Sequence, residues 1–286
     1  MAVKTIKIII AEGRHDTAFI SRVMKANGYI DPETKVNQIE PKFLSDYIVE
    51  LFKDLKFSRN LADMERHRHP VPSFLLSRDI EGGKEIALLF ASDGLGNHKN
   101  VTRILSYFIN RLHNEFGLED MARESVDKIK VIFNADADDK GIDVRIASIN
   151  ECIQKLKDNT LGGKIKETFA GVGNYGKCEY MGLTWGAFIS ANDTGYGTLE
   201  DFVLPLFEEG RDDLCNEVKA FIQKKDLYKI PQTGKYNEQK TRIGLMGQID
   251  MPGVSNSVLI DQSKMIAEEM LQQGIYGKIG TYIREF

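Results

Sequence analysis

The sequence predicts an α/β fold with a mainly parallel sheet flanked by helices. Three observations support this prediction. Short, nearly continuous apolar runs rich in β-branched residues recur along the chain, a tight turn follows each run, and most turns lead into a segment with apolar residues at helical spacing. Strands that alternate with helices in this way imply right-handed crossovers between parallel strands.

The first strand, turn and helix lie at the start of the chain. Residues 6–11 form an apolar run that predicts a strand buried on both faces. Residues 12–16 follow as a turn, and residues 17–27 have the spacing of a helix that ends at Gly28. A helical insertion is then expected at about residues 31–84.

The same unit recurs further along the chain. Further strands are expected at residues 85–90, 128–133 and 185–190. Helices are expected at residues 101–116 and 144–156, after the second and third strands. The fourth strand ends in a glycine-rich stretch, residues 191–198, before the apolar segment at residues 199–205.

Two regions are expected from this order of elements. Residues 1–205 form the α/β domain, and residues 206–286 form a mainly helical C-terminal extension packed on it. The chain has 286 residues, of which 42% are hydrophobic and 28% charged, with a mean hydropathy of -0.30. These values are typical of a folded globular protein and exclude a disordered chain.

Composition also bears on location and partners. Cys152, Cys178 and Cys215 lie far apart and are odd in number, so they predict neither a disulfide framework nor a CxxC metal site. No apolar run is long enough to cross a bilayer or to serve as a signal peptide. We therefore expect a cytoplasmic protein with no membrane contact. The net charge of -4 means that a polyanion must meet a local basic patch or a metal ion.

Acidic residues follow three of the four predicted strands. Glu12 follows the first strand, Asp136 and Asp138 follow the third, and Glu200 and Asp201 come shortly after the fourth. Ligands bind off the carboxyl ends of parallel strands, so these five side chains share one edge of the predicted sheet. Carboxylates held close together repel one another unless a cation lies between them. Oxygen ligands of this kind suit Mg²⁺.

The Asp-x-Asp spacing has two interpretations. If the segment stays extended, Asp136 and Asp138 point to the same side and can share a metal ion, while Ala137 points away. The alternative is that both residues cap the following helix and interact with its positive end. Asp16 is open to the same alternative, because an acidic residue in the first turn of a helix is stabilising there.

The order of these motifs resembles that of the Toprim domain, which occurs in topoisomerases, primases and OLD-type nucleases. The chain has Glu12-Gly-x-x-Asp16, then Asp136-Ala-Asp138, then Gly197-x-Leu-Glu-Asp201, and finally Lys240 before Pro252-Gly253. The closer resemblance is to small Toprim-related proteins that share this set. It covers about residues 5–255 in pieces and implies a Toprim-like, Rossmann-like sheet.

The resemblance also implies roles for single residues. Glu12 matches the Toprim glutamate, which is a general acid/base or a metal ligand, and Asp136 and Asp138 match the metal-binding pair. Glu200 matches a later acidic position of the OLD-like branch, and Lys240 would stabilise charge on phosphate. With Asp16 and Asp201 as further candidate ligands, the expected cofactor is Mg²⁺ or Mn²⁺. Asn134 precedes the aspartate pair and is a departure that removes no matched ligand.

A basic segment at residues 224–242 is the candidate substrate-facing surface. It carries six positive and two negative side chains with two interleaved tyrosines, which suits a nucleic-acid backbone and stacked bases. Lys235, Lys240 and Arg242 are the candidate substrate-binding residues. The alternative is an ordinary solvated charged surface.

Two other motifs have simpler explanations. His67 and His69 match no usual zinc spacing, so a transition-metal site there is disfavoured. Residues 92–97 could cradle a phosphate at a helix start, but they lack the Lys-Ser/Thr of a P-loop, so a plain turn is favoured.

Three classes of function remain open. The first is a metal-dependent nuclease that cleaves DNA or RNA; the OLD-like resemblance implies a separate ATPase partner, because this chain has no ATPase motif. The second is a non-catalytic nucleic-acid or nucleotide-binding module. The third is a phosphohydrolase or nucleotidyl enzyme with a small substrate. A homo-oligomer is left open.

Overall fold

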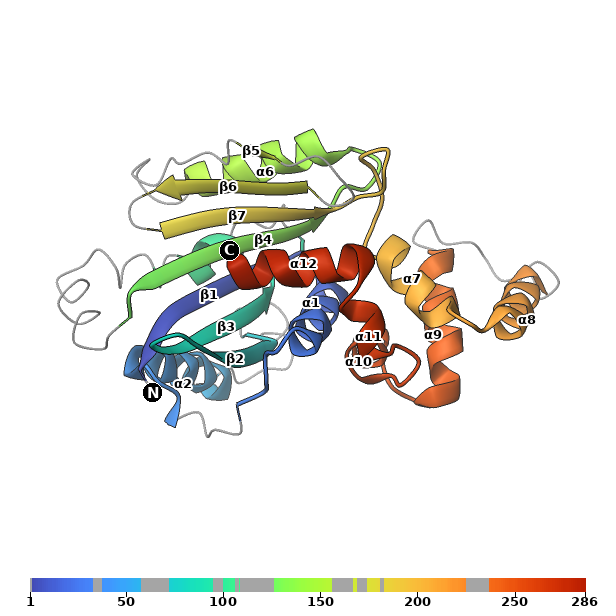
Figure 1. The fold of residues 1–286 in the computed structure, drawn as a ribbon, viewed down its shortest axis with the longest axis horizontal. Helices are drawn as coiled ribbons and strands as arrows, with labels where there is room; N and C mark the ends of the chain where they lie inside the picture. Colours follow the sequence, from blue (N-terminus) through green and yellow to red (C-terminus); the bar gives the residue numbers. More distant parts are fainter. Residues whose placement is uncertain are drawn as a thin grey trace.

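The computed structural model of the chain describes residues 2–32, 38–57, 72–94, 100–105, 108, 126–155, 167–168, 174–180, 183–224 and 237–286. These residues form one seven-stranded sheet with helices on both faces (Figure 1). The predicted α/β class, with a sheet flanked by helices, is thus confirmed.

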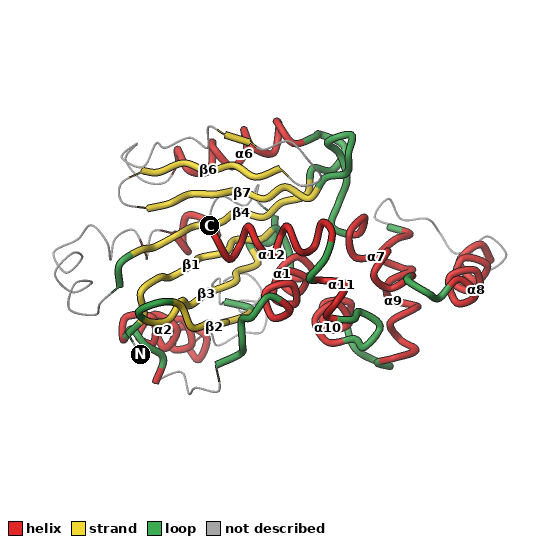
Figure 2. The backbone as a smooth tube through the Cα atoms, viewed as in Figure 1, coloured by secondary structure: helices red, strands yellow, loops and turns green. Residues whose placement is uncertain are grey.

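Four parallel strands form the centre of the sheet. They are β1 (Val3–Ala11), β3 (Gly83–Ala91), β4 (Lys128–Asp136) and β7 (Leu183–Ser190), in the spatial order β3, β1, β4, β7. All four predicted strands are present, each a few residues longer than predicted. Because neighbouring strands pair in parallel, their carboxyl ends meet at one edge of the sheet; Figure 2 shows the strands side by side in yellow.

Antiparallel strands extend the sheet on both sides. β2 (Phe74–Ile80) pairs with β3, while β6 (Asn174–Tyr180) pairs with β7 and carries the two-residue strand β5 (Glu167–Thr168). The sequence analysis missed these three strands, and β2 lies within the range expected to be a helical insertion. Residues 74–80 include Ser77, Arg78 and Asp79, so they lack the continuous apolar run of a strand buried on both faces.

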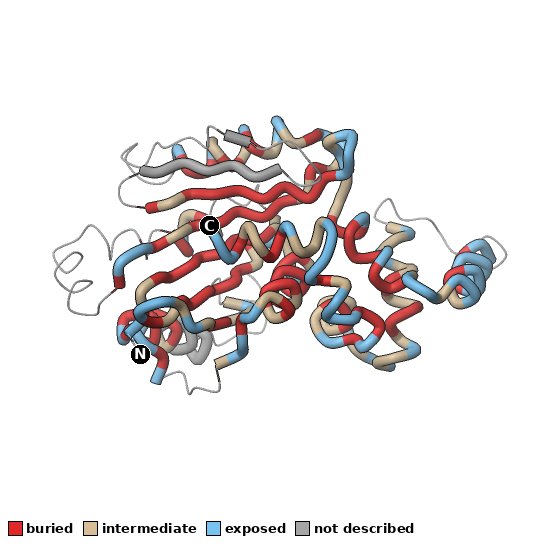
Figure 3. Tube along the Cα trace, in the orientation of Figure 1, coloured by how far each residue is buried: buried red, intermediate tan, exposed pale blue. Residues whose placement is uncertain are grey.

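Each face of the sheet packs against its own set of helices. Alternate residues of β1 enter opposite cores: Ile8 and Ile10 belong to one, and Ile9 and Ala11 to the other. The first core also includes α2 (Lys42–Phe57), α6 (Ile142–Lys155) and the helical residues 100–105. The second includes α1 (Arg14–Ala26) and the C-terminal helices. Buried residues therefore make up most of each central strand (Figure 3).

Within the described residues, the last strand is followed by six helices. They are α7 (Glu200–Glu208), α8 (Asp212–Gln223), α9 (Glu238–Asp250), α10 (Asn256–Gln262), α11 (Glu268–Leu271) and α12 (Gly274–Glu285). Helices α7, α8 and α9 extend beyond the carboxyl edge of the sheet, whereas α10, α11 and α12 return to pack on α1 (Figure 1). Segments far apart in the chain thus meet around the start of α1.

A buried lysine anchors α12 to the sheet. Lys7 on β1 is fully buried, forms an ion pair with Glu85 at 3.0 Å, and donates hydrogen bonds to the carbonyl oxygens of Ile283 and Arg284. A positive charge is favourable at this end of a helix, where carbonyl groups lack partners. Burial lowers the pKa of Lys7 to about 8, against the opposing effect of Glu85. The last turn of α12 is therefore held over β1.

None of the described helices combines the length and the apolar character that crossing a bilayer requires.

Candidate acidic site at the carboxyl edge of the sheet

A cavity of about 330 Å³ lies where β1 and β4 end and where α1 and α7 begin. Five carboxylates line it, together with Lys240 and His15; these acidic residues are Glu12, Asp16, Asp136, Asp138 and Glu200. Carboxylates separated by up to 188 positions in the sequence therefore share one small space. The expectation that Glu12 and the aspartate pair share an edge of the sheet agrees with this arrangement.

Glu12 and Asp136 hold the loops at the ends of the strands in place. Glu12 Oε2 accepts a hydrogen bond from the Asp136 backbone N–H at 3.3 Å. Asp136 Oδ1 accepts one from the Leu199 N–H at 2.8 Å, and Leu199 is the residue just before α7. Asp136 therefore stabilises the start of a helix, as the capping alternative expected, but that helix is α7 and not the one that follows Asp136 in sequence.

Asp138 is not in extended conformation, so the reasoning from strand alternation was wrong for this residue. Its φ is 51°, and its backbone forms a bridge with Gly197 through hydrogen bonds of 2.7 and 3.1 Å. Gly197 has a φ of 122°, which favours glycine. The Asp138 carboxylate faces the cavity and forms an ion pair with Arg145, whose guanidinium lies 3.9 Å from Glu12 Oε1.

Asp16 and Glu200 are the most buried acidic residues of the cavity. Asp16 is 6% exposed, and Glu200 is 3% exposed. Asp16 Oδ2 accepts a hydrogen bond from the Gly13 N–H at 2.9 Å, and Glu200 Oε1 lies 3.4 Å from Lys240 Nζ. The second oxygen of each carboxylate, Asp16 Oδ1 and Glu200 Oε2, is buried without a hydrogen-bond partner. Burying such an acceptor is costly unless something bonds to it.

The electrostatics of the cavity favour protonation when no cation is present. Burial is the main cause that raises the pKa of Asp16, to about 7, and the charge of Glu12 adds to the shift. Burial also raises the pKa of Asp136, and the charges of Asp16, Glu200 and Glu12 raise it further. Bound cations reverse such shifts, because they favour the ionised form.

Basic side chains also line the cavity, and Lys240 and His15 reach it from different helices. Lys240 lies in the first turn of α9, where the Asn237 side chain accepts a hydrogen bond from the Lys240 N–H at 2.9 Å and caps the helix. His15 lies in the first turn of α1; burial lowers its pKa, and the charge of Lys240 lowers it further. Both effects favour the neutral form of the His15 imidazole.

The remaining predicted residues lie elsewhere. Asp201 does not line the cavity, because its Oδ2 accepts from the Thr198 N–H at 2.8 Å and its Oδ1 from Gln239 at 2.7 Å. Arg242 forms an ion pair with Glu208 and also lies outside the cavity wall. Lys235, most of the basic segment 224–242, and the pair His67 and His69 lie outside the described residues.

A metal ion would require some of these side chains to turn. No group of three or more His, Cys, Asp or Glu side chains in the described part of the chain has its ligand atoms arranged to hold a metal ion. The oxygens that have partners bind backbone N–H groups, Arg145 or Lys240 instead. The five carboxylates nevertheless offer only oxygen ligands, which suits Mg²⁺ or Mn²⁺. The two oxygens without a hydrogen-bond partner are free to bind a cation.

Three side chains of the site were not assigned a role from the sequence. Arg14 and His15 were placed in a turn at residues 12–16, but α1 begins at Arg14, so both lie in the first turn of a helix and line the cavity. The Glu-Gly-x-x-Asp motif itself could have indicated this, because it resembles a helix start. No local signal pointed to Arg145, which reaches the site from the first turns of α6.

The fold and the cavity together define an α/β protein with an acidic site at the carboxyl edge of its sheet. The family described as "Protein of unknown function (DUF3226)" matches residues 6–273, and the chain belongs to this family. The match includes the cavity and the C-terminal helices through α11. Comparisons with curated proteins and with solved structures give no match.

Proposed function

We propose that the protein is a divalent-metal-dependent phosphoryl-transfer enzyme on a Toprim-like fold, and that it cleaves phosphodiester bonds of DNA or RNA. The observation that carries the proposal is the pair of buried, unpartnered oxygens of Asp16 and Glu200 in one cavity with three further carboxylates. A fold does not retain such a cluster for stability, because both burial and mutual repulsion oppose it. A cation that binds there offsets both costs.

Separate roles follow for the residues of the cavity. Asp16, Asp136 and Glu200 would hold Mg²⁺ or Mn²⁺, with Glu12 and Asp138 as further ligands if Arg145 moves away. When bound, such an ion activates water and neutralises phosphate charge. Lys240 stabilises negative charge on the phosphate oxygens. Glu12, with a side chain 26% exposed, is the candidate general base.

The Toprim-like assignment is supported by the position of the motifs on the sheet. Glu12 directly follows β1, Asp136 is the last residue of the neighbouring strand β4, with Asp138 just beyond it, and Glu200 begins the helix after β7. A polynucleotide would approach an acidic cavity through the bound cation and through basic side chains such as Arg14 and Lys240. A separate ATPase and a homo-oligomer belong to the same proposal as partners.

The test is a cleavage assay on single- and double-stranded DNA and RNA and on nucleotides, in Mg²⁺, in Mn²⁺ and in EDTA. We expect metal-dependent cleavage of at least one substrate, reduced by at least about 100-fold in Glu12→Ala and Glu200→Gln. Asp139→Asn is the matched control, because Asp139 is an exposed carboxylate next to Asp138 that does not line the cavity. The proposal fails if no substrate is cleaved or if Glu200→Gln cleaves as fast as the unmodified protein.

A non-catalytic nucleotide- or nucleic-acid-binding module is the second candidate. The ion pair of Arg145 with Asp138 and the contact of Lys240 with Glu200 favour it, because these cations already offset part of the acidic charge. This candidate predicts ligand binding with no turnover. A small-substrate phosphohydrolase would be recognised in the same assay by turnover of nucleotides alone.

A further inference from the structure

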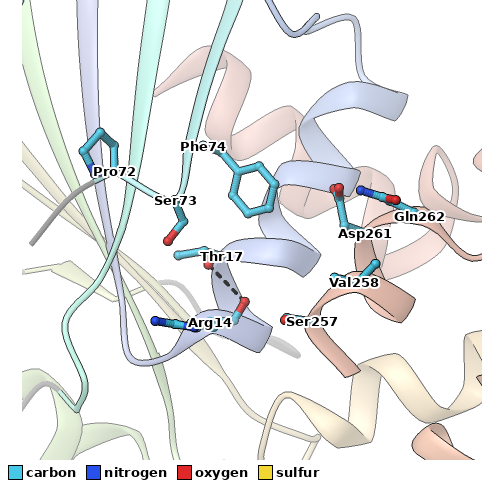
Figure 4. Close-up of a pocket in the computed structure, with 9 residues that line it drawn as sticks. All are labelled: Arg14, Thr17, Pro72, Ser73, Phe74, Ser257, Val258, Asp261 and Gln262. Carbon is cyan, nitrogen blue, oxygen red and sulfur yellow. Dashed lines mark hydrogen bonds between the residues drawn. The ribbon is translucent and has the colours of Figure 1, made fainter. Parts of the chain in front are cut away.

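A second cavity, of about 450 Å³, opens beside the acidic one. Three elements enclose it: the first turn of α1, the chain entering β2, and α10 (Figure 4). Its volume falls within the range of small-molecule binding pockets, about 300–1,000 Å³. None of the acidic residues of the first cavity lines it.

Arg14 belongs to the walls of both cavities. It is exposed, and among the described residues no hydrogen bond or ion pair engages its guanidinium. A free guanidinium at the boundary between two cavities is placed to bind an anion that lies between them. Phosphate suits this position, because a guanidinium forms two parallel hydrogen bonds to its oxygens.

The second cavity has apolar and polar walls. Phe74 and Val258 supply apolar surface from β2 and α10, and Gln262 adds an exposed amide. The Asp261 side chain is 6% exposed and is fixed by Ser21 and Lys25, each 3.3 Å from its Oδ1. A fixed, buried acceptor beside apolar surface is the usual composition of a pocket that orients a ring with N–H or O–H donors.

We propose that this second cavity binds one nucleoside unit of the substrate, with the attached phosphate held by Arg14 at the boundary with the acidic site. The substrate class follows from the combination: an anion position, apolar surface for a base, and acceptors for the amino or hydroxyl groups of the base and sugar. The proposal rests on the proposed function for the role of the phosphate. Binding of a free nucleotide, however, requires neither metal nor cleavage.

The test is calorimetric titration of the full chain with AMP, GMP, CMP and UMP in EDTA. We expect at least one nucleotide to bind. Val258→Trp, which fills the cavity, should weaken that binding at least tenfold, and so should Arg14→Gln. Gln262→Trp serves as a second filling variant; because Gln262 is exposed, we expect a large side chain there to leave the fold intact. Lys264→Trp is the control, since Lys264 is exposed just beyond α10 and outside the cavity.

The outcomes separate this proposal from the cleavage proposal. Asp136→Ala should lose cleavage and keep nucleotide binding in EDTA. The nucleoside pocket is overturned if no nucleotide binds, or if both filling variants bind as well as Lys264→Trp does. Cleavage that stays intact in both filling variants would also overturn the pocket while leaving the metal site standing. Binding without any cleavage would retain the pocket and reject the enzyme.

Discussion

The two carboxylate oxygens of Asp16 have different surroundings. One oxygen accepts from the Gly13 N–H and stabilises the start of α1, while the other is buried in the acidic cavity without a partner. An asparagine at position 16 can still accept the hydrogen bond from the Gly13 N–H, but it removes the negative charge. Charge and hydrogen bonding can therefore be separated experimentally at this position.

Asp16→Asn is expected to stabilise the metal-free protein by about 1–2 kcal/mol at pH 8, which is typical of relieving a strained functional site. The folded pKa of Asp16, about 7, is raised above the ordinary value of 3.8, so protonated Asp16 favours the folded state. That contribution is fully present below pH 3.8 and is lost as the pH rises through 7. The stability gap between variant and parent should therefore widen from pH 4 to pH 8.

Urea unfolding in EDTA at several pH values measures this gap. Glu209→Gln is a control, because Glu209 is an exposed carboxylate at the end of α7. A destabilised Asp16→Asn, or a gap that narrows with rising pH, would show that the carboxylate is favourable in the metal-free fold.

At the scale of elements, α12 depends on a close approach to the sheet. A Cβ at Gly186 on β7 would overlap the ring of Phe286 and the hydroxyl of Tyr282. Together with the contacts of Lys7 at the carbonyl end of α12, this glycine fixes the helix over the central strands. The same helix packs on α1, whose first turn forms part of both cavities.

Gly186→Val is expected to destabilise the protein by about 1–3 kcal/mol, the usual cost of overpacking a filled core. Thermal unfolding measures the loss. Phe286→Ala in the same chain removes one of the clashing rings, so the cost of the valine should be smaller in that background. Equal costs in both backgrounds would mean that α12 does not lie against β7.

The central strands could be predicted because they are buried on both faces and therefore appear as continuous apolar runs. The antiparallel strands at the edges could not, because residues such as Arg78 and Asp79 interrupt their apolar pattern. The predicted helix at residues 17–27 begins three residues earlier, at Arg14, since Asp16 caps it from within the motif assigned to a turn.

The candidate site, like the fold, could be predicted only in part from the sequence. The alternation of strands and helices indicated that Glu12 and Asp136 share one edge of the sheet. Adjacent helical residues point about 100° apart, so the sequence could not decide which of Glu200 and Asp201 faces the cavity. The contact of Arg145 with Asp138 depends on the positive φ of Asp138, which no local pattern specified.

At the scale of the whole molecule, the fold places an acidic cavity, a free guanidinium and a second cavity side by side. The overall charge of -4 is concentrated in part at this edge, where five carboxylates meet Arg14 and Lys240. A cation in the first cavity would change the local charge and make it compatible with a phosphate at the boundary. Metal binding is thus the central claim on which the enzymatic proposal depends.

A crystal of the protein soaked in Mn²⁺, measured near the manganese absorption edge, tests this claim most directly. We expect an anomalous peak inside the acidic cavity, with oxygens of Asp136 and of Asp16 or Glu200 as ligands and with Lys240 displaced from Glu200. An empty cavity at saturating Mn²⁺, or manganese bound only elsewhere, would contradict the account.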